Sequence, residues 1–281
     1  MMTIPTIADL RRVLDDARAE DRTVGFVPTM GYLHDGHASL MREARAETHV
    51  VVVSIFVNPL QFGPTEDLAA YPRDLARDTA LAEAAGVDVL FVPSVAEMYP
   101  APVLTTVSVA GVSEPLEGEA RPSHFAGVAT VVAKLFSIVG PCRAYFGAKD
   151  FQQVAVVRRM VQDLSLPVEV NACPTLRELD GLAMSSRNVY LSPEEREAAP
   201  VVYTALRSGA AAIAAGERDP AAVRELMAGI IEAEPLARLD YAAVVDAESF
   251  LVPDPLTGNL RLLAAVRFGK ARLIDNVGVT V

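Results

Sequence analysis

The chain has 281 residues, of which 51% are hydrophobic, 22% charged and 6% aromatic. A chain of this length and composition can bury an ordinary core, which excludes a disordered or low-complexity protein and favours two domains over one small one. The formal net charge of −11 opposes binding to a phosphate backbone. We therefore expect no nucleic acid partner.

Cysteine content and the N-terminal sequence indicate the cellular setting. Cys142 and Cys173 are too few for a disulfide framework and lack the paired spacing of a zinc site. The N-terminus has no basic segment followed by an apolar one, and the longest β-rich apolar stretch, residues 50–57, is far shorter than a membrane span. We expect a soluble, cytoplasmic protein with no membrane partner.

Up to Cys173, apolar runs typical of strands alternate with helical patterns. The expected strands, in chain order, cover 23–30, 49–57, 87–93, 144–147 and 167–170. The expected helices cover 37–47, 74–85, 126–139 and 150–163. The strands are apolar throughout, as in parallel strands covered by helices on both faces. This order predicts an α/β fold with a doubly wound, Rossmann-like parallel sheet, whose ligands bind beyond the carboxyl ends of its strands.

The sequence pattern changes after Cys173. Residues 174–196 are polar and rich in turn formers, and an alanine-rich helical region follows over 194–232. Three runs with strand character cover 240–246, 261–268 and 271–277. The sequence therefore predicts a nucleotide- and substrate-binding domain over 1–175 and a second, smaller α+β domain over 176–281.

The first expected strand leads into the first long helix through PTMGYLHDGH, residues 28–37. Gly31 and Gly36 allow the backbone to approach a ligand closely, and the helix start offers unpaired N–H groups and a positive dipole end. His34 and His37 could both donate to phosphate oxygens and stabilise charge on a leaving group. The segment favours a phosphate pocket, although the histidines could instead only cap backbone groups. A zinc site is disfavoured because a third ligand at metal spacing is missing.

A second loop, FGAKD over 146–150, also joins a strand to a helix, and Gln153 lies one turn further on. The chain has 25 Lys+Arg, of which only Lys134, Lys149 and Lys270 are lysine. A lysine kept in a glycine-bearing loop suggests a compact positive charge for a nucleotide phosphate. The alternative is that Lys149 only solvates the helix start and that Asp150 is its N-cap.

Two further segments carry polar groups suited to ligands. In DGLAMSSRN, residues 180–188, the hydroxyls of Ser185 and Ser186 and the guanidinium of Arg187 could close over a polyphosphate, although the composition also fits a linker. In NPLQFGP, residues 58–64, the amides suit hydroxyl and carboxylate groups of a small substrate, although a plain turn fits equally well.

Several common nucleotide and hydrolase motifs are missing from the sequence. It contains no GxxxxGK, GxGxxG, HExxH or GxSxG. The P-loop kinase, standard dinucleotide, metalloprotease and hydrolase-elbow interpretations therefore lose their main support. Three loops with phosphate-type chemistry at one sheet edge and a domain junction remain to be explained together.

Taken in order, these motifs resemble the pantoate–β-alanine ligase family. The matching segments are PTMG and HDGH within 28–37, SIFVNP and QFG within 54–63, RPSHFAGV over 121–128, FGAKD with QQ within 146–153, and DGLAMSSRN over 180–188. The resemblance is strong over residues 20–195 and looser over 261–276, and it places the chain in the nucleotidyltransferase superfamily with an HxGH motif. Asp35 and Ala148 stand where the family commonly has Glu. Neither position is expected to contact substrate.

The resemblance implies a two-step, AMP-forming ligation of (R)-pantoate and β-alanine to pantothenate. The pantoate carboxylate would attack the α-phosphorus of Mg-ATP to give pantoyl adenylate and pyrophosphate, and the β-alanine amine would then displace AMP. The resemblance also implies ATP as a substrate, Mg²⁺ as the metal and a homodimer. It implies that the second domain acts as a lid.

The resemblance also assigns roles to residues by position. The implied catalytic residues are His37, His34, Lys149, Ser185 and Arg187, with His37 as proton donor to the leaving pyrophosphate. The residues implied to hold ATP are Met30, Gly31, His34, His37, Gly147, Lys149, Asp150, Leu176, Met184, Ser185, Ser186 and Arg187. Pantoate would bind to Gln61, Gln153 and Asn58, and Asp78 falls where the family has acidic residues near Mg²⁺.

Rival functions differ in what they do with AMP. An adenylyltransferase would use the same HxGH apparatus and leave AMP on its product, so release of AMP separates the two. A nucleotide sensor without chemistry would need degraded catalytic positions, whereas the implied residues are all present. An aminoacyl-tRNA synthetase is disfavoured by the acidic charge and by the lack of a tRNA-binding appendage.

Overall fold

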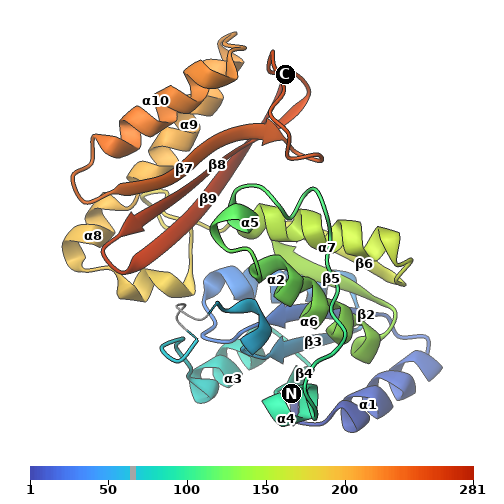
Figure 1. Cartoon of the computed structure of the whole chain (residues 1–281). Helices are drawn as coiled ribbons and strands as arrows, with labels where there is room; N and C mark the ends of the chain where they lie inside the picture. Colours follow the sequence, from blue (N-terminus) through green and yellow to red (C-terminus); the bar gives the residue numbers. More distant parts are fainter. Residues whose placement is uncertain (64–67) are drawn as a thin grey trace. The chain divides into compact units, whose positions relative to one another are not determined.

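The computed structural model describes residues 1–63 and 68–281. The chain forms two compact units (Figure 1). Unit 1 comprises Met1–Ala148 and Gln152–Pro174, and unit 2 comprises Lys149–Phe151 and Thr175–Val281. The sequence-based boundary at 175 leaves Lys149–Phe151 in the first domain, whereas in the structure these residues belong to unit 2.

Packing explains why Lys149–Phe151 belongs to unit 2. The side-chain amide of Asn276 donates to the Lys149 carbonyl at 2.8 Å. The Phe151 ring lies 5.8 Å from the Phe250 ring, centroid to centroid, and the Arg261 guanidinium lies 3.9 Å from the Phe151 centroid. These partners are all more than 90 residues away in the sequence, so local patterns could not reveal the assignment.

Unit 1 contains a parallel sheet of six strands in the order β1-β4-β3-β2-β5-β6. The strands are β1 (Met2–Ile4), β2 (Val24–Thr29), β3 (Val50–Ile55), β4 (Val89–Phe91), β5 (Cys142–Gly147) and β6 (Val168–Cys173). From β2 the chain first builds outward through β3 and β4 and then returns to the other side of β2 with β5 and β6. The carboxyl ends of β2 and β5 therefore form the topological switch point, where ligands of such sheets bind.

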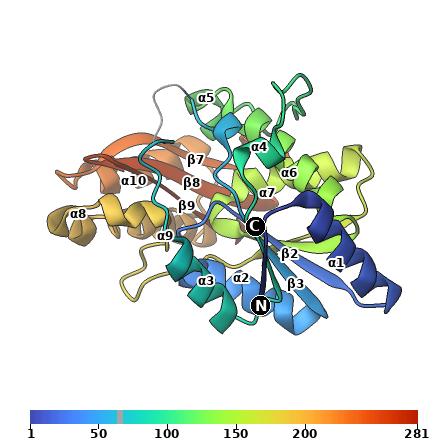
Figure 2. The ribbon, with the colours of Figure 1, turned by 90° about the horizontal axis from the view of Figure 1, so that it is seen from below.

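Helices cover both faces of this sheet, which confirms the predicted doubly wound fold (Figure 2). The helices are α1 (Ile7–Ala19), α6 (His124–Val139) and α7 (Phe151–Asp163) on one face, and α2 (Asp35–Glu47) and α3 (Leu75–Ala84) on the other. Phe26 and Val52 belong to the core of the first face, and Val27 and Val53 belong to that of the second. Because neighbouring residues point to opposite faces, a strand buried on both sides must be apolar throughout.

Short elements complete unit 1. They are η1 (Pro59–Gln61), α4 (Val95–Met98), α5 (Glu117–Ala120) and η2 (Ala148–Asp150), the last of which continues into unit 2. β1 and α1 precede Thr23, where the first expected strand begins, and the sequence did not predict them. Leu10, Leu14 and Ala17 give α1 a fully buried stripe at helical spacing, which is the signal that could have revealed it.

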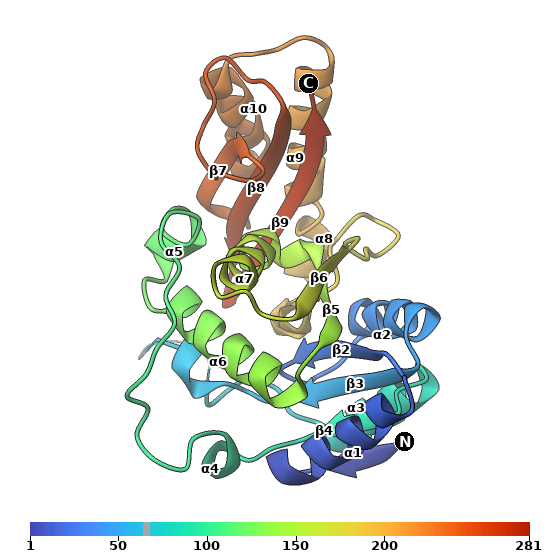
Figure 3. The ribbon, with the colours of Figure 1, turned by 90° about the vertical axis from the view of Figure 1, so that its right-hand side faces the viewer.

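Unit 2 is an antiparallel sheet with two helices against one face (Figure 3). Its strands are β7 (Arg238–Asp246), β8 (Asn259–Phe268) and β9 (Ala271–Thr280). The two helices against the sheet are α9 (Val201–Ala214) and α10 (Pro220–Glu232). The short helices η3 (Ser186–Tyr190) and α8 (Pro193–Ala198) precede them. The three strands confirm the predicted α+β character. The expected helical region is divided at Pro200 and again at Gly216, whose φ of +109° lies in the left-handed region.

Among the described residues, none of the helices has the length and apolar character that crossing a membrane requires.

Candidate functional site

The loop after β2 turns sharply before α2 begins. Gly31 has a φ of +85° and Tyr32 a φ of +50°, so two successive residues lie in the left-handed region. A Cβ on Gly31 would lie 2.9 Å from Ile55 Cγ2 and 3.0 Å from Asp78 Oδ2. Position 31 therefore requires glycine for two reasons: its φ is positive, and there is no space for a Cβ atom.

Asp78 anchors the backbone of the loop after β2. It lies on α3 with 1% of its surface exposed, and its two carboxylate oxygens accept from the Tyr32 N–H at 2.8 Å and the Leu33 N–H at 2.6 Å. Burial raises the pKa of Asp78, and the two backbone hydrogen bonds oppose that rise. The carboxylate fixes the turn by accepting from two backbone donors, of which the Leu33 N–H is buried and the Tyr32 N–H partly buried.

Asp78 is the residue that the family resemblance places near Mg²⁺, and in this structure its carboxylate anchors the loop. Both oxygens are engaged by backbone N–H groups, and the side chain is enclosed. Within residues 1–63 and 68–281, no group of three or more His, Cys, Asp or Glu side chains is arranged to hold a metal ion. These contacts fit a loop anchor, and the role of Asp78 towards Mg²⁺ stays a prediction.

His34 and His37 lie together where α2 begins. Their ring centroids are 4.1 Å apart, and the His34 backbone N–H donates to His37 Nδ1 at 3.3 Å in a capping box. The capping alternative is thus observed. Because His37 Nδ1 accepts a hydrogen bond, a neutral His37 ring carries its proton on Nε2. Capping and donation to a ligand can therefore use different nitrogens of the same ring.

The amides of Asn58 and Gln61 form a buried pair after β3, with 1% and 7% of their surfaces exposed. Asn58 Nδ2 donates to Gln61 Oε1 at 3.2 Å and to the Gly127 carbonyl at 3.1 Å. Gln61 Nε2 then lies 3.0 Å from Met30 Sδ. The structure brings together two predicted pantoate residues, Asn58 and Gln61, and a predicted ATP residue, Met30. Pro64, at the end of the predicted turn, lies outside the described residues.

Three residues of this region were not assigned roles from the sequence. The Tyr99 hydroxyl donates to Asn58 Oδ1 at 2.9 Å, and burial raises the pKa of Tyr99 to about 12, so the hydroxyl stays protonated. His124 Nδ1 lies 3.0 Å from the Gln61 carbonyl oxygen, to which Arg121 Nη2 donates at 3.4 Å. The RPSHFAGV match could have indicated Arg121 and His124. Tyr99 has no local signal.

Two further predicted residues of unit 1 lie on the β5 side of the switch point. Gly147 is the last residue of β5, paired with Cys173 of β6. Gln153 lies half-buried in the first turn of α7. The neighbouring Gln152 is buried and structural, since its side chain accepts from the Glu117 N–H and donates to two backbone carbonyls.

In unit 2, residues 176–184 form a hairpin-like loop. Arg177 and Ala183 form an isolated antiparallel bridge, and the Met184 N–H donates to the Leu176 carbonyl at 3.0 Å. Gly181, with a φ of +97°, makes the turn, and a Cβ there would lie 2.3 Å from the Tyr203 ring. The loop pairs the predicted ATP residues Leu176 and Met184 directly.

The predicted hydroxyls and Arg187 follow this loop at a short helix. Ser185 is the N-cap of η3, and its Oγ accepts from the Arg187 N–H at 3.2 Å. Ser186 and Arg187 are the first two residues of η3 and are half-buried. The Asn188 side chain donates to the Ala183 carbonyl at 3.1 Å. Residues 184–187 therefore have a defined backbone and are not an irregular linker.

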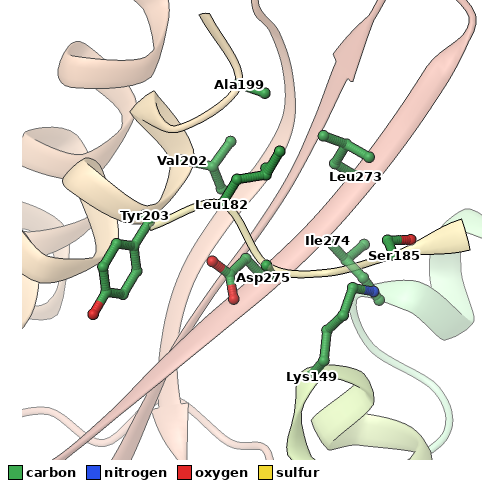
Figure 4. Close-up of a pocket in the computed structure, with 10 residues that line it drawn as sticks. Lys149, Leu182, Ser185, Ala199, Val202, Tyr203, Leu273, Ile274 and Asp275 are labelled. Atoms are coloured by element: carbon green, nitrogen blue, oxygen red, sulfur yellow. The ribbon is translucent and has the colours of Figure 1, made fainter. Parts of the chain in front are cut away.

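Lys149 and Ser185 line one small cavity of unit 2 (Figure 4). The other lining residues are Leu182, Ala183, Ala199, Val202, Tyr203, Leu273, Ile274 and Asp275. Lys149 Nζ lies 3.6 Å from Asp150 Oδ1, and the Lys149 side chain is 18% exposed. The structure thus brings Lys149, Asp150 and Ser185 near each other within one unit.

The predicted site residues fall into two groups, one in each unit. Unit 1 holds the residues Met30, Gly31, His34, His37, Asn58, Gln61, Asp78, Gly147 and Gln153. Unit 2 holds Lys149, Asp150, Leu176, Met184, Ser185, Ser186 and Arg187. The first group combines imidazole donors at a helix start with buried amides, and the second combines hydroxyls and cationic side chains. Both sets suit anionic ligands.

Comparisons with known proteins agree with this chemistry. A family model described as pantoate-beta-alanine ligase matches residues 2–278. The pantothenate synthetase of Roseiflexus sp. (strain RS-1) is 57% identical over 277 residues, covering 98% of each chain. The pantothenate synthetase of Heliobacterium modesticaldum is 56% identical over 281 residues, covering 100% of each chain.

Two solved structures are similar over nearly the whole chain. Pantothenate synthetase from Thermus thermophilus has a TM-score of 0.95 at 52% identity and covers 100% of both chains. The pantoate-beta-alanine ligase of Francisella tularensis, complexed with beta-gamma ATP and beta-alanine, has a TM-score of 0.81 at 34% identity and covers 99% of this chain and 97% of its own.

Proposed function

Because the chain belongs to the pantoate–β-alanine ligase family, we propose that it joins (R)-pantoate to β-alanine at the expense of ATP, through a pantoyl adenylate. The products would be pantothenate, AMP and pyrophosphate. The observation that carries the proposal is the group in unit 1 where His34 and His37 cap the start of α2 and the Asn58–Gln61 pair lies against Met30. Unit 1 thus contains hydrogen-bond donors suited to phosphate oxygens and hydrogen-bond donors suited to a carboxylate.

The reaction needs no enzyme nucleophile, because the pantoate carboxylate itself attacks phosphorus. The protein's contribution is positioning and charge stabilisation, and well-oriented reactants are worth roughly 7–11 kcal/mol. His37 Nε2–H and His34 would donate to phosphate oxygens beside the positive end of α2. In the second step the β-alanine amine attacks the acyl carbon and AMP leaves.

Unit 2 would neutralise the charge that builds up on pyrophosphate. Lys149 supplies a compact charge, and Arg187 can form two parallel hydrogen bonds to phosphate oxygens. Ser185 and Ser186 add hydroxyl donors at the start of η3. Met30, Gly31, Gly147, Asp150, Leu176 and Met184 would hold the rest of the nucleotide.

Pantoate would bind to the side-chain amides of unit 1. Asn58 donates to Gln61 Oε1, so Gln61 presents its Nε2 donor towards Met30. An Nε2 donor suits a carboxylate or hydroxyl oxygen of a small acid. Gln153 would supply a second amide, and Asn58 would act by holding Gln61 in this orientation.

Magnesium enters this proposal with the substrate, as Mg-ATP. Mg²⁺ is commonly held by substrate phosphates and keeps several waters, so it does not need a protein cage. This role agrees with the finding that Asp78 anchors a loop through both of its oxygens. We also propose a cytoplasmic homodimer, on the family resemblance alone, and light scattering of the purified protein would measure the mass in solution.

Nucleotide product analysis tests the function directly. The purified protein is incubated with Mg-ATP, pantoate and β-alanine, and each acid is omitted in turn. We expect AMP to accumulate with turnover only when both acids are present. AMP retained on an adenylated product would support an adenylyltransferase instead, and nucleotide binding without any AMP would support a sensor.

A further inference from the structure

We propose that Arg177, through its ion pair with Asp275, is a positioning residue that holds residues 184–187 and Lys149 in one fixed arrangement. The inference rests on the proposed function, because it assumes that these segments bind the phosphates of ATP. It concerns a residue that contacts neither ligand in the proposal above. All of its partners lie in unit 2.

Arg177 lies on the first arm of the loop formed by residues 176–184, opposite Ala183. Its Nη1 and Nη2 donate to the two carboxylate oxygens of Asp275 at 2.5 and 2.9 Å. Nη1 also donates to the Gly181 carbonyl at 3.1 Å, and Nη2 donates to the Asn276 carbonyl at 3.3 Å. One guanidinium therefore ties the turn of the loop to β9 through four hydrogen bonds.

The pair is enclosed and stacked as well as hydrogen bonded. The side chains of Arg177 and Asp275 are 16% and 6% exposed. The Arg177 guanidinium carbon lies 3.9 Å from the centroid of the Tyr203 ring, against which Gly181 also packs without room for a Cβ. A planar, stacked and bidentate contact of this kind is specific to arginine, and lysine cannot reproduce it.

The same two residues of β9 also reach Lys149. Asp275 Oδ1 accepts from the Asn276 N–H at 2.7 Å, and Asn276 Nδ2 donates to the Lys149 carbonyl at 2.8 Å. The path therefore runs from the turn at Gly181 through Arg177 and β9 to the backbone of Lys149. Lys149 and Ser185 line a common cavity together with Asp275 (Figure 4).

Charge strengthens the case that the pair positions these segments. Loss of one partner of an enclosed ion pair leaves an uncompensated charge, which is energetically unfavourable. The segments that the pair joined then lower their free energy by rearranging. Rearrangement here would displace Lys149 relative to residues 184–187 without removing either group. The expected defect is therefore in phosphate binding and in the first chemical step.

The test compares Arg177→Lys with wild type in steady-state kinetics of the full-length enzyme. We expect the KM for ATP to rise about tenfold or more, because lysine keeps the charge but loses the bidentate and stacked contacts. The KM for pantoate should stay within about twofold, since pantoate is assigned to unit 1. Tyr203→Phe keeps the ring and should retain the wild-type KM for ATP, whereas Tyr203→Ala should raise it.

Asp240→Asn is the matched control. Asp240 accepts from Arg267 at 3.1 Å and from Arg272 at 2.7 Å in the same unit, with side-chain exposures of 20% for Asp240 and 15% for Arg272. This variant loses an ion pair on the same sheet but leaves the contacts of Arg177 in place. A general loss of stability would affect both variants, whereas loss of positioning would raise the KM for ATP only in Arg177→Lys.

Asn276→Ala provides a second route to the same conclusion if Arg177→Lys does not fold. It removes the donor to the Lys149 carbonyl while keeping the Arg177–Asp275 pair, and we again expect a higher KM for ATP. A folded Arg177→Lys or Asn276→Ala enzyme with wild-type KM for ATP would overturn the inference. If instead the wild-type protein forms no AMP with both acids present, the proposed function itself fails.

Discussion

The loops after β2 and β6 are held in place by anchors of opposite charge. In unit 1 an anion, Asp78, accepts from the N–H groups of Tyr32 and Leu33. In unit 2 a cation, Arg177, donates to the carbonyls of Gly181 and Asn276. Each anchor leaves its loop suited to phosphate in a different way. Arg177 binds carbonyl oxygens that would otherwise repel an anion. Asp78 binds the N–H groups of Tyr32 and Leu33 and leaves the imidazoles and the start of α2 as donors.

The largest effect should come from the donor group of unit 1. We expect His37→Ala to lower kcat by roughly 10²–10⁴-fold, the range in which a positioned proton donor contributes. The thermal unfolding midpoint should fall by only a few degrees, because the ring lies outside the core and the variant loses a single capping hydrogen bond. His49→Ala is the control, since His49 contacts Thr23 and belongs to no predicted site. Near-wild-type kcat in His37→Ala would remove the proton-donor role.

The next largest effect on activity is expected at Asp78, which anchors the loop after β2. Asp78→Asn keeps the shape but replaces one acceptor oxygen by an NH₂ group, so one of the two N–H groups that Asp78 accepts from loses its acceptor. We expect the free energy of unfolding to fall by about 1–3 kcal/mol, together with loss of activity. Urea unfolding and a kcat measurement check this. Full activity at saturating Mg-ATP would show that the loop does not need this anchor.

A smaller and more selective effect is expected at Gln61. Gln61→Ala removes the oriented Nε2 donor, and we expect the KM for pantoate to rise about tenfold, as for one lost hydrogen bond to a charged group. The KM for ATP should change much less. Gln162→Ala, on the exposed side of α7, is the control. Equal changes in the two KM values would contradict the assignment of Gln61 to pantoate.

The smallest effect on stability is expected at Asp180, at the turn of the loop formed by residues 176–184. The hydrogen bond from Arg196 lowers the pKa of Asp180, and the backbone N–H of Leu182 contributes in the same direction. Because the native pKa lies below the unfolded one, this stabilisation is present above the ordinary pKa of Asp and disappears as the pH falls through the native value. Asp180→Asn should lower stability by less than about 1 kcal/mol at neutral pH.

Unfolding curves at several pH values test that sign. The difference in stability between wild type and Asp180→Asn should shrink as the solution becomes more acidic, until both carry a neutral side chain at position 180. A difference that grows towards acid pH would mean that Asp180 is not stabilised as an anion in the native state.

The sequence revealed the features that local patterns encode. Apolar runs and their spacing predicted the doubly wound sheet, and two of the loops that carry predicted ligand groups lie after β2 and β5, at its switch point. Contacts between distant segments were not predictable in this way. Asp78 is 45 residues from Leu33, and Asn276 is 127 residues from Lys149. No periodicity links such pairs, which is why the sequence showed neither the anchoring contacts of Asp78 nor the contacts of Lys149 with unit 2.

The predicted site shows the same division. Residues in one motif, such as His34 with His37 or Ser185 with Arg187, were predicted together because a short segment fixes their spacing. The residues that orient them come from elsewhere in the chain. Tyr99 orients Asn58, and Arg177 joins a loop to β9. A single tyrosine or arginine carries no signal of that role in an unaligned sequence.

In the proposed reaction pantoate is activated as an acyl adenylate, and this route transfers one carboxylate oxygen of pantoate to phosphorus. Pantoate labelled with ¹⁸O in its carboxylate is turned over with Mg-ATP and β-alanine, and the released AMP is examined by mass spectrometry. An acyl adenylate requires one labelled oxygen to remain on phosphorus when the amine displaces AMP, so we predict one ¹⁸O atom per AMP. Unlabelled AMP formed at the rate of pantothenate would rule out a pantoyl adenylate.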